Sequence, residues 1–329
     1  MTAPVAMAEL WRGGMLESTH LGHAVICGAD GGIEAAWGDP QAVIFPRSSC
    51  KMLQALPLME SGAGADLRDD QLALACASHQ GAALHTGKVA RWLSDLGLSE
   101  SDLRCGAHEP SDREERERLI RAGESPCQLH NNCSGKHAGF VMMNRHIGGD
   151  ADYVDPAHPL QGAIRTAFEE VTEETSPGFG IDGCSAPNFA TSVHGLARAM
   201  ARFATAREDG DARDRAAHRL TRAMARHPDL VAGEGRACTE LMRAMEGRVT
   251  IKTGAEAVFI AILPEQKKGI ALKITDGGTR GAEAAICALL VRLGALDPDH
   301  PATLKRLNAV QKNWRGIETG ILRAAPGFA

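Results

Sequence analysis

Strand-like segments near both ends of the chain enclose a long run of helical segments, and this order limits the folds that are open to it. Near the start, residues 23–27 and 33–37 flank the turn at 29–32, where glycine tolerates positive φ, which predicts a β-hairpin. Near the end, the apolar runs 257–263 and 269–274 flank a short polar stretch, which predicts a second hairpin. A sheet therefore draws its strands from both ends of the sequence.

The section between the two hairpins has the apolar spacing of helices. We expect helices at about residues 52–59, 70–77, 84–96, 113–122, 135–145, 160–172 and 190–204, and one more after the second hairpin at 279–293. Strand pairs that bracket a helical block favour an α+β fold over a wound parallel sheet. We expect an antiparallel sheet with helices packed against it and a separate helical section, within one domain over residues 1–329 or two closely joined lobes.

Composition and charge exclude several classes of function. The 329 residues are 44% hydrophobic and 23% charged, as in ordinary globular proteins. A net charge of −5 without a basic stripe argues against a nucleic-acid partner. The longest apolar runs are far shorter than the ~20 residues that span a bilayer, and residues 1–14 lack the apolar core of a signal peptide. We therefore expect no membrane association and a cytoplasmic location.

The arginine-dense segment 198–226 also carries acidic residues, which predicts a solvated helical surface.

Ser48 and Lys51 have the spacing of a serine nucleophile and its base. A serine hydroxyl becomes nucleophilic when a nearby base takes its proton, and a neutral lysine one helical turn further along can act as that base. We expect Ser48 near a helix N-terminus, where backbone N–H groups can stabilise an oxyanion. A Ser-x-x-Lys spacing alone is a weak signal, because an N-cap serine followed by a solvated lysine is common.

The segment Lys252-Thr253-Gly254 adds a second lysine just before the predicted C-terminal hairpin. Lys252 can disfavour the charged form of Lys51 by like-charge repulsion and can hold a substrate carboxylate. An early Ser-x-x-Lys and a late Lys-Thr-Gly are typical of β-lactamases and penicillin-binding proteins, although the Ser-Asp-Asn element of that set is absent.

A polar stretch at a predicted helix start, residues 130–137, combines thiol, amine, amide and imidazole groups. Together with Asp182-Gly183-Cys184 it can form a metal site, because two thiolates suit Zn²⁺ and water or an unusual lysine ligand can complete the coordination. The alternative is a pair of buried thiols without a metal, and the nine cysteines are otherwise typical of free thiols.

Residues 178–183 match the dinucleotide fingerprint G-x-G-x-x-G, but no predicted strand precedes them, which argues against a nucleotide site.

Five blocks in this order resemble the rhizobial-type (class 3) L-asparaginases, whose fold is similar to that of serine β-lactamases and glutaminases. They are residues 46–51, 77–79, 130–139, 182–184 and 252–256. The resemblance runs over most of the chain and implies two Ser-Lys pairs, with Ser48 the nucleophile, Lys51 its base, and Ser78 with Lys252 relaying the proton.

The resemblance also implies a zinc ion that assists substrate binding, held by Cys133, Lys136, Cys184 and water. His137 and Arg47 are then candidates for binding the charged α-groups of the substrate, and Asp182 for a hydrogen bond to Lys136 or to the substrate ammonium. Cys238 resembles a position near the site, with an ordinary helix thiol as the equal alternative.

The implied activity is hydrolysis of L-asparagine to L-aspartate and ammonia by a homodimer. A glutaminase, or an enzyme that uses both amides, remains the nearest alternative, because one methylene is worth only ~1–3 kcal/mol of discrimination. Two further functions also stay open on the same fold. They are a penicillin-interacting hydrolase and a non-catalytic zinc-binding or thiol-sensing protein.

Overall fold

The computed structural model describes residues 2–329, which form two compact units. Unit 1 contains the segment that ends at Ser49, together with Thr191–Thr205 and Glu240–Ala329. Unit 2 contains Cys50–Ala190 and Ala206–Thr239. Each unit is therefore built from segments that are distant in sequence. The expectation of one domain or two closely joined lobes stays a prediction.

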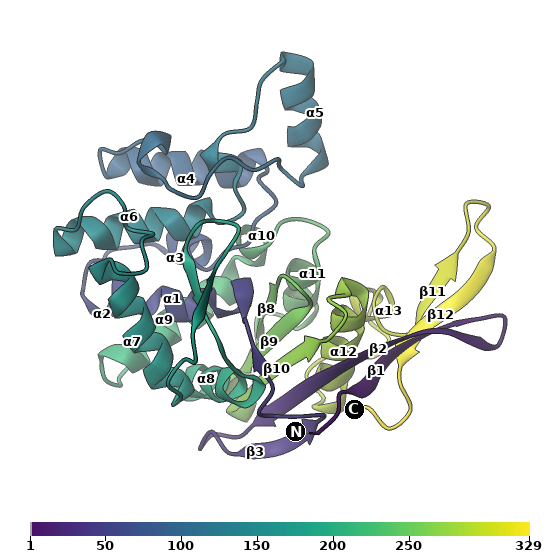
Figure 1. Cartoon of the computed structure of the whole chain (residues 1–329). Coiled ribbons are helices and arrows are strands. Elements are labelled where there is room, and N and C mark those ends of the chain that lie inside the picture. Colours follow the sequence, from purple (N-terminus) through teal and green to yellow (C-terminus); the bar gives the residue numbers. More distant parts are fainter. Residues whose placement is uncertain (1) are drawn as a thin grey trace. The chain divides into compact units, whose positions relative to one another are not determined.

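Unit 1 is built on an eight-stranded antiparallel sheet (Figure 1). The strands run in the order β11-β12-β1-β2-β10-β9-β8, and β3 pairs with β2 outside this path. Their bounds are β1 Val5–Arg12, β2 Met15–Cys27, β3 Ile33–Trp37, β8 Thr250–Gly254, β9 Val258–Leu263, β10 Lys268–Ile274, β11 Ala309–Lys312 and β12 Glu318–Ala324. The short strands β4 (Val43–Ile44) and β7 (Thr191–Ser192) form a separate pair. The sheet thus interleaves strands from both ends of the chain.

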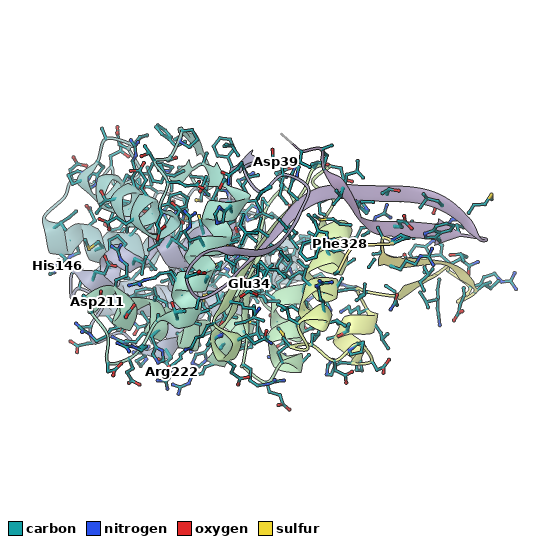
Figure 2. The ribbon with its side chains drawn as sticks, turned by 90° about the horizontal axis from the view of Figure 1, so that it is seen from below. Glu34, Asp39, His146, Asp211, Arg222 and Phe328 are labelled. Atoms are coloured by element: carbon teal, nitrogen blue, oxygen red, sulfur yellow. The ribbon has the colours of Figure 1, made fainter. Side chains whose placement is uncertain are left out.

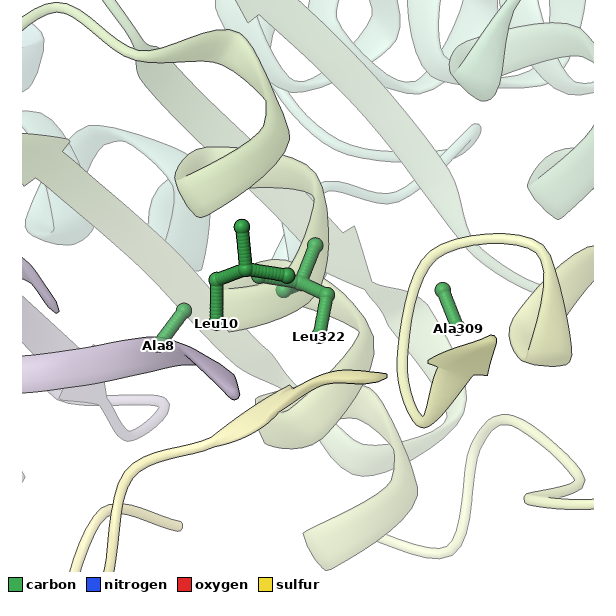
Figure 3. Close-up of a cluster of buried hydrophobic side chains, with 5 residues drawn as sticks. Ala8, Leu10, Ala309 and Leu322 are labelled. Carbon is green, nitrogen blue, oxygen red and sulfur yellow. The ribbon is translucent and has the colours of Figure 1, made fainter. Parts of the chain in front are cut away.

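Two helices pack on this sheet, α8 (Val193–Thr205) and α12 (Thr279–Arg292). All six residues of β9 are buried, because the strand is a continuous apolar run in the middle of the sheet. Figure 3 shows a smaller cluster in which Leu10 and Leu322 from neighbouring strands pack together. Phe328, labelled in Figure 2, packs edge-on against Trp37 with ring centroids 5.4 Å apart. The hydrophobic core of unit 1 therefore extends along the sheet, from the buried strand β9 to Phe328 near the C-terminus.

Unit 2 is mainly helical. Its helices are α1 Lys51–Gln54, α2 Leu56–Glu60, α3 Asp69–Ala75, α4 Ala83–Asp95, α5 Arg113–Ala122, α6 Ser134–Ile147, α7 Pro159–Thr172, α9 Ala212–Arg226 and α10 Pro228–Val231. A small hairpin of β5 (Phe179–Ile181) and β6 (Pro187–Phe189) completes it. The short helix α3 packs against α4, α6, α9 and α10, and residues 71–75 in it are buried. The loop that follows α3 carries Ser78, so this packing fixes the position of that serine.

The structure confirms the predicted α+β fold class with an antiparallel sheet, packed helices and a helical section. Both predicted hairpins form, as β2–β3 and β9–β10. The segment predicted as one helix at 52–59 is divided at Ala55 into α1 and α2. Strands β1, β11 and β12 were not predicted, since their residues do not alternate cleanly and several are partly exposed. Strand β8, which is mostly buried, was not predicted either. Within residues 2–329, no helix combines the length and apolarity that crossing a bilayer requires.

Candidate functional site

Ser48 lies in a fixed turn of unit 1, the 3₁₀ helix η1 (Arg47–Cys50) that leads directly into α1. The backbone N–H and the hydroxyl of Ser49 both donate to the Pro46 carbonyl, at 3.1 and 2.7 Å. Arg47 has φ 52, a left-handed conformation that is strained for a non-glycine residue and is often found at functional sites. Ser48 itself is half-buried. Unit 1 ends its first segment at Ser49, so Ser48 belongs to unit 1 and Lys51 to unit 2.

The Lys252-Thr253-Gly254 segment forms most of β8, which pairs with β9. Lys252 is fully buried, and its ammonium donates to the Thr253 carbonyl at 2.8 Å. A Cβ on Gly254 would lie 2.5 Å from the Pro46 carbonyl oxygen and 3.1 Å from the backbone nitrogen of Ser49. Only glycine therefore allows the end of β8 to approach the turn that carries Ser48. Unit 1 brings two of the predicted catalytic segments together.

Lys51 and Ser78 lie side by side in unit 2. Lys51 is 1% exposed, and its side-chain nitrogen donates to the carbonyl of Ala77, the residue that precedes Ser78. The backbone N–H of Ser78 donates to the Val231 carbonyl at 2.8 Å, which ties this loop to α10. Ser78 belongs to unit 2 and Lys252 to unit 1, so their predicted pairing stays a prediction.

His79 connects the loop of Ser78 to the start of α6. Its Nδ1 accepts the N–H of Gly81 at 3.1 Å, so Nε2 carries the proton and donates to the Ser134 hydroxyl at 2.9 Å. Burial, together with the neighbouring His85, holds the pKa of His79 well below its usual range, so the ring is neutral. Sequence reasoning gave His79 no role, although it lies in one of the five blocks.

Gly135 sets how closely α6 approaches α3. A Cβ at this position would overlap the carbonyl oxygen of Leu74 near the end of α3. The first turn of α6 therefore lies directly against the helix that leads to Ser78. This first turn carries Lys136 and His137, so the close approach fixes the backbone from which both side chains extend.

Cys133, Lys136 and Cys184 form a buried cluster in unit 2. Each of the three is at most 3% exposed, and the Lys136 ammonium donates to the Cys184 sulfur at 3.1 Å. Asn131 holds Cys133 in place, since its Oδ1 accepts the Cys133 N–H at 2.9 Å while its Nδ2 donates to the Cys105 carbonyl at 2.8 Å. The structure thus brings together all three residues that the sequence analysis named as metal ligands.

The protonation of this cluster is unequal. The Cys133 thiol donates to the Cys184 sulfur, which lowers the pKa of Cys184 well below that of a free thiol and, together with burial, raises that of Cys133 well above it. Burial disfavours the Lys136 ammonium, but the two sulfurs outweigh burial and raise the pKa of Lys136. Without a metal the cluster therefore holds a thiolate, a thiol and an ammonium.

His137 lies beside this cluster and is fully buried. The hydroxyl of Tyr153 is 2.9 Å from His137 Nδ1 and also accepts the N–H of Arg104 at 2.8 Å. The other ring nitrogen, Nε2, is buried and has no partner at hydrogen-bonding geometry, and Cys184 lies near it. Burial lowers the pKa of His137, so the ring is neutral. Tyr153 is the only tyrosine of the chain, a signal that sequence analysis did not use.

Comparison with protein families gives a single assignment. The family model for L-asparaginase II matches residues 8–324, nearly the whole chain. The chain belongs to the L-asparaginase II family. No curated protein matches it in sequence. The family assignment confirms the resemblance seen in the sequence, and it makes the chain an amidohydrolase.

Solved structures that align with this family member are distant in sequence. A structure of Mglu in its native form is 13% identical, with 89% of this chain and 69% of that chain covered and a TM-score of 0.48. A β-lactamase from Mycobacterium bovis is 13% identical, with 82% of this chain and 94% of that chain covered and a TM-score of 0.44. Both TM-scores lie below 0.5, so the assignment rests on the family match and the fold class on the elements described above.

The buried cluster of this L-asparaginase II family member has donors that suit zinc. Two cysteine sulfurs are typical zinc donors when deprotonated, whereas the neutral amine of a lysine is an unusual one. Nε2 of His137 adds a polar atom beside them. Within residues 2–329, no three His, Cys, Asp or Glu side chains are arranged to hold a metal. A three-ligand site here therefore needs Lys136 as the third protein ligand. Zinc binding itself stays a prediction.

The predicted substrate-binding residues are distributed over both units. Asp182 lies near Lys136 in unit 2, and its Oδ1 accepts the N–H of Gly183 at 2.9 Å. His137 is in unit 2, whereas Arg47 is in unit 1. Cys238 is buried near the end of the second segment of unit 2. The roles of Arg47, His137 and Asp182 in substrate binding stay predictions, as does the resemblance of Cys238 to a position near the site.

Proposed function

We propose that this amidohydrolase cleaves the side-chain amide of L-asparagine to give L-aspartate and ammonia, with Ser48 as the nucleophile. The observation that supports the proposal is the burial of Lys51 against the carbonyl of Ala77, because Lys51 follows Ser48 by three residues in the sequence and contacts the residue that precedes Ser78. A lysine buried in this way can serve as a base when it is neutral, and the close approach of Gly254 to the Ser48 turn supports the same assignment.

In the proposed reaction, Lys51 takes the proton of the Ser48 hydroxyl while the serine oxygen attacks the amide carbonyl carbon. The carbon–nitrogen bond breaks after the nitrogen receives a proton through the relay of Lys51, Ser78 and Lys252, and ammonia leaves. Water then attacks the acyl-enzyme, which releases aspartate and returns the proton to Ser48. Backbone N–H groups at the start of α1 are candidates for stabilising the oxyanion.

Cys133, Lys136 and Cys184 would hold the zinc ion. When bound, zinc would supply a positive charge that orients the carboxylate or amino group of the substrate. Asp182 and His137, beside the cluster, would bind the charged α-groups of asparagine, and Arg47 would contribute from the Ser48 turn. The proposed arrangement separates binding, in the thiol-lysine cluster, from proton transfer by the Ser-Lys pairs.

The test is ammonia release from L-asparagine and, separately, from L-glutamine, for the wild type and Ser48→Ala, with and without added Zn²⁺. Turnover of asparagine that is lost in the variant supports the proposal. Equal turnover of both amides would mean that the enzyme is a dual asparagine and glutamine amidohydrolase and not an asparaginase. No ammonia from either amide would contradict the proposal and favour a non-catalytic zinc protein on this fold.

A further inference from the structure

Cys127 differs from every other cysteine of the chain in its exposure. The other eight cysteines are buried, whereas Cys127 is partly exposed to solvent. It lies in unit 2, directly before the 3₁₀ helix η3 (Gln128–His130), and takes no part in the catalytic and metal-binding groups described above. Solvent can therefore reach the residue in the folded protein, which is a requirement for any chemistry of its thiol.

The Cys127 thiol faces a histidine that a carboxylate holds in place. The Cys127 sulfur lies 3.3 Å from His130 Nδ1, and His130 Nε2 lies 3.2 Å from Oε1 of Glu115. Both His130 and Glu115 are buried, at 7% and 6% exposure. A thiol, the near nitrogen of an imidazole and a carboxylate on its far nitrogen form the arrangement by which proteins activate a cysteine.

The protonation states of this group follow from its contacts. Arg118 donates to the Glu115 carboxylate at 2.8 Å and, with His130, lowers the pKa of Glu115, which is therefore ionised. An ionised carboxylate only accepts hydrogen bonds, so His130 Nε2 carries the proton and Nδ1 offers its lone pair. Nδ1 accepts the backbone N–H of Cys127 at 3.0 Å and is also within reach of the thiol proton.

The charged groups around His130 come from several neighbouring segments. Glu115 and Arg118 come from α5, and Arg118 also pairs with Glu124 at 2.9 Å. Glu100, which precedes this segment, accepts the N–H of Gln128 at 2.7 Å. His79 lies nearby and is neutral. Among these groups, the Glu115 carboxylate is the one in direct contact with the imidazole, 3.2 Å from Nε2.

We propose that Cys127 is a covalent modification site, a thiol activated by His130 and Glu115 that forms mixed disulfides with small-molecule disulfides. The Cys127 thiol gives its proton to His130, and the thiolate attacks one sulfur of the incoming disulfide. A new sulfur–sulfur bond forms to Cys127 as the original one breaks. The leaving thiolate takes up a proton, so the disulfide is the oxidant and one small thiol is released.

The test is the reaction of the native wild-type protein with oxidised glutathione, followed over time by intact mass and peptide mapping. We expect one adduct, at Cys127, which dithiothreitol removes. His130→Gln keeps a polar side chain but cannot take the proton, and we expect it to slow the reaction at neutral pH about tenfold or more. Glu115→Gln, which preserves the contact without the charge, should slow it by a smaller factor.

The pH profile separates activation from a merely structural role. In the wild type the rate should stay high below the range in which an ordinary thiol ionises, whereas in His130→Gln it should fall about tenfold per pH unit there. Cys127→Ser should take up no glutathione. Adducts at the buried cysteines, a His130→Gln rate equal to that of the wild type, or a wild-type profile like that of free glutathione would each overturn the proposal.

Discussion

Ser48 lies in a turn whose neighbours are fixed by hydrogen bonds, so its replacement tests chemistry with little effect on folding. We expect Ser48→Ala to lower asparagine turnover about a thousandfold or more, since the nucleophile acts as a unit with its base. The measurement is ammonia release at saturating asparagine, with circular dichroism to verify the fold. An active Ser48→Ala variant would remove this serine from the mechanism.

Ser49 provides the matched control in the same turn. Its hydroxyl donates to the Pro46 carbonyl at 2.7 Å and is fully buried, so it supports the turn. We expect Ser49→Ala to lose about 1 kcal/mol of unfolding free energy, the typical worth of one hydrogen bond, and to keep most of its activity. If both variants lose activity equally, the loss comes from the turn as a whole and the nucleophile is not identified.

The thiol-lysine cluster predicts a proton count for zinc binding. The pKa of Cys133 and that of Lys136 are raised and that of Cys184 is lowered, so at neutral pH the first two carry protons and the third does not. Zinc needs all three deprotonated, so we expect release of about two protons per zinc and an affinity that falls as pH falls. Calorimetry in buffers of different ionisation enthalpy measures this number.

Lys136→Met tests which group supplies the second proton. The variant removes the amine and keeps most of the buried volume, so we expect weaker zinc binding with about one proton released. Unchanged affinity and an unchanged proton count in Lys136→Met would show that the lysine is not a ligand.

At the scale of elements, the approach of β8 to the Ser48 turn is the contact most sensitive to a single methyl group. A Cβ at Gly254 would meet the Pro46 carbonyl at 2.5 Å, and backbone atoms cannot move aside as a flexible side chain can. We expect Gly254→Ala to cost about 1–3 kcal/mol of stability and to lower activity by displacing the turn. Chemical denaturation and the ammonia assay measure the two effects.

The helical Gly87 is a control for the same substitution. It lies inside α4 and is exposed, and a Cβ added to it would have no neighbouring atom within 4 Å. We expect Gly87→Ala to stabilise the protein by roughly 0.5–1 kcal/mol, because alanine has the higher helix propensity. Equal effects of the two substitutions would contradict the close approach at Gly254.

At the scale of the whole molecule, the chain crosses between its two units several times, so neither unit is one continuous segment. Residues 50–190 carry all three proposed zinc ligands but lack α9, which packs against α2 and α3. We expect the isolated segment 50–190 to lose cooperative unfolding, because the buried face of α3 would be exposed. Joining 50–190 to 206–239 with a short flexible linker should restore cooperative unfolding and zinc binding. Denaturation curves that are equally cooperative for both chains would contradict this expectation.

Much of the local structure could be predicted from the sequence. The helix at 113–122 was predicted with the bounds that the structure has, since Asp112 caps its start and Gly123 ends it in a left-handed conformation. The β2–β3 and β9–β10 hairpins were predicted because turn residues separate apolar runs of strand length. β11 and β12 were missed because their residues are mostly exposed or partly exposed and lack a clear period of two.

The sequence by itself determined the family, the fold class and the residue types available for chemistry, because motifs and periodic patterns depend on neighbours in the chain. Only the tertiary structure decided which of these groups meet. Lys136 bonds to the sulfur of Cys184, and the single tyrosine, Tyr153, bonds to His137. Such contacts depend on how α6 packs against its surroundings, and long-range packing leaves no periodic signal in one sequence.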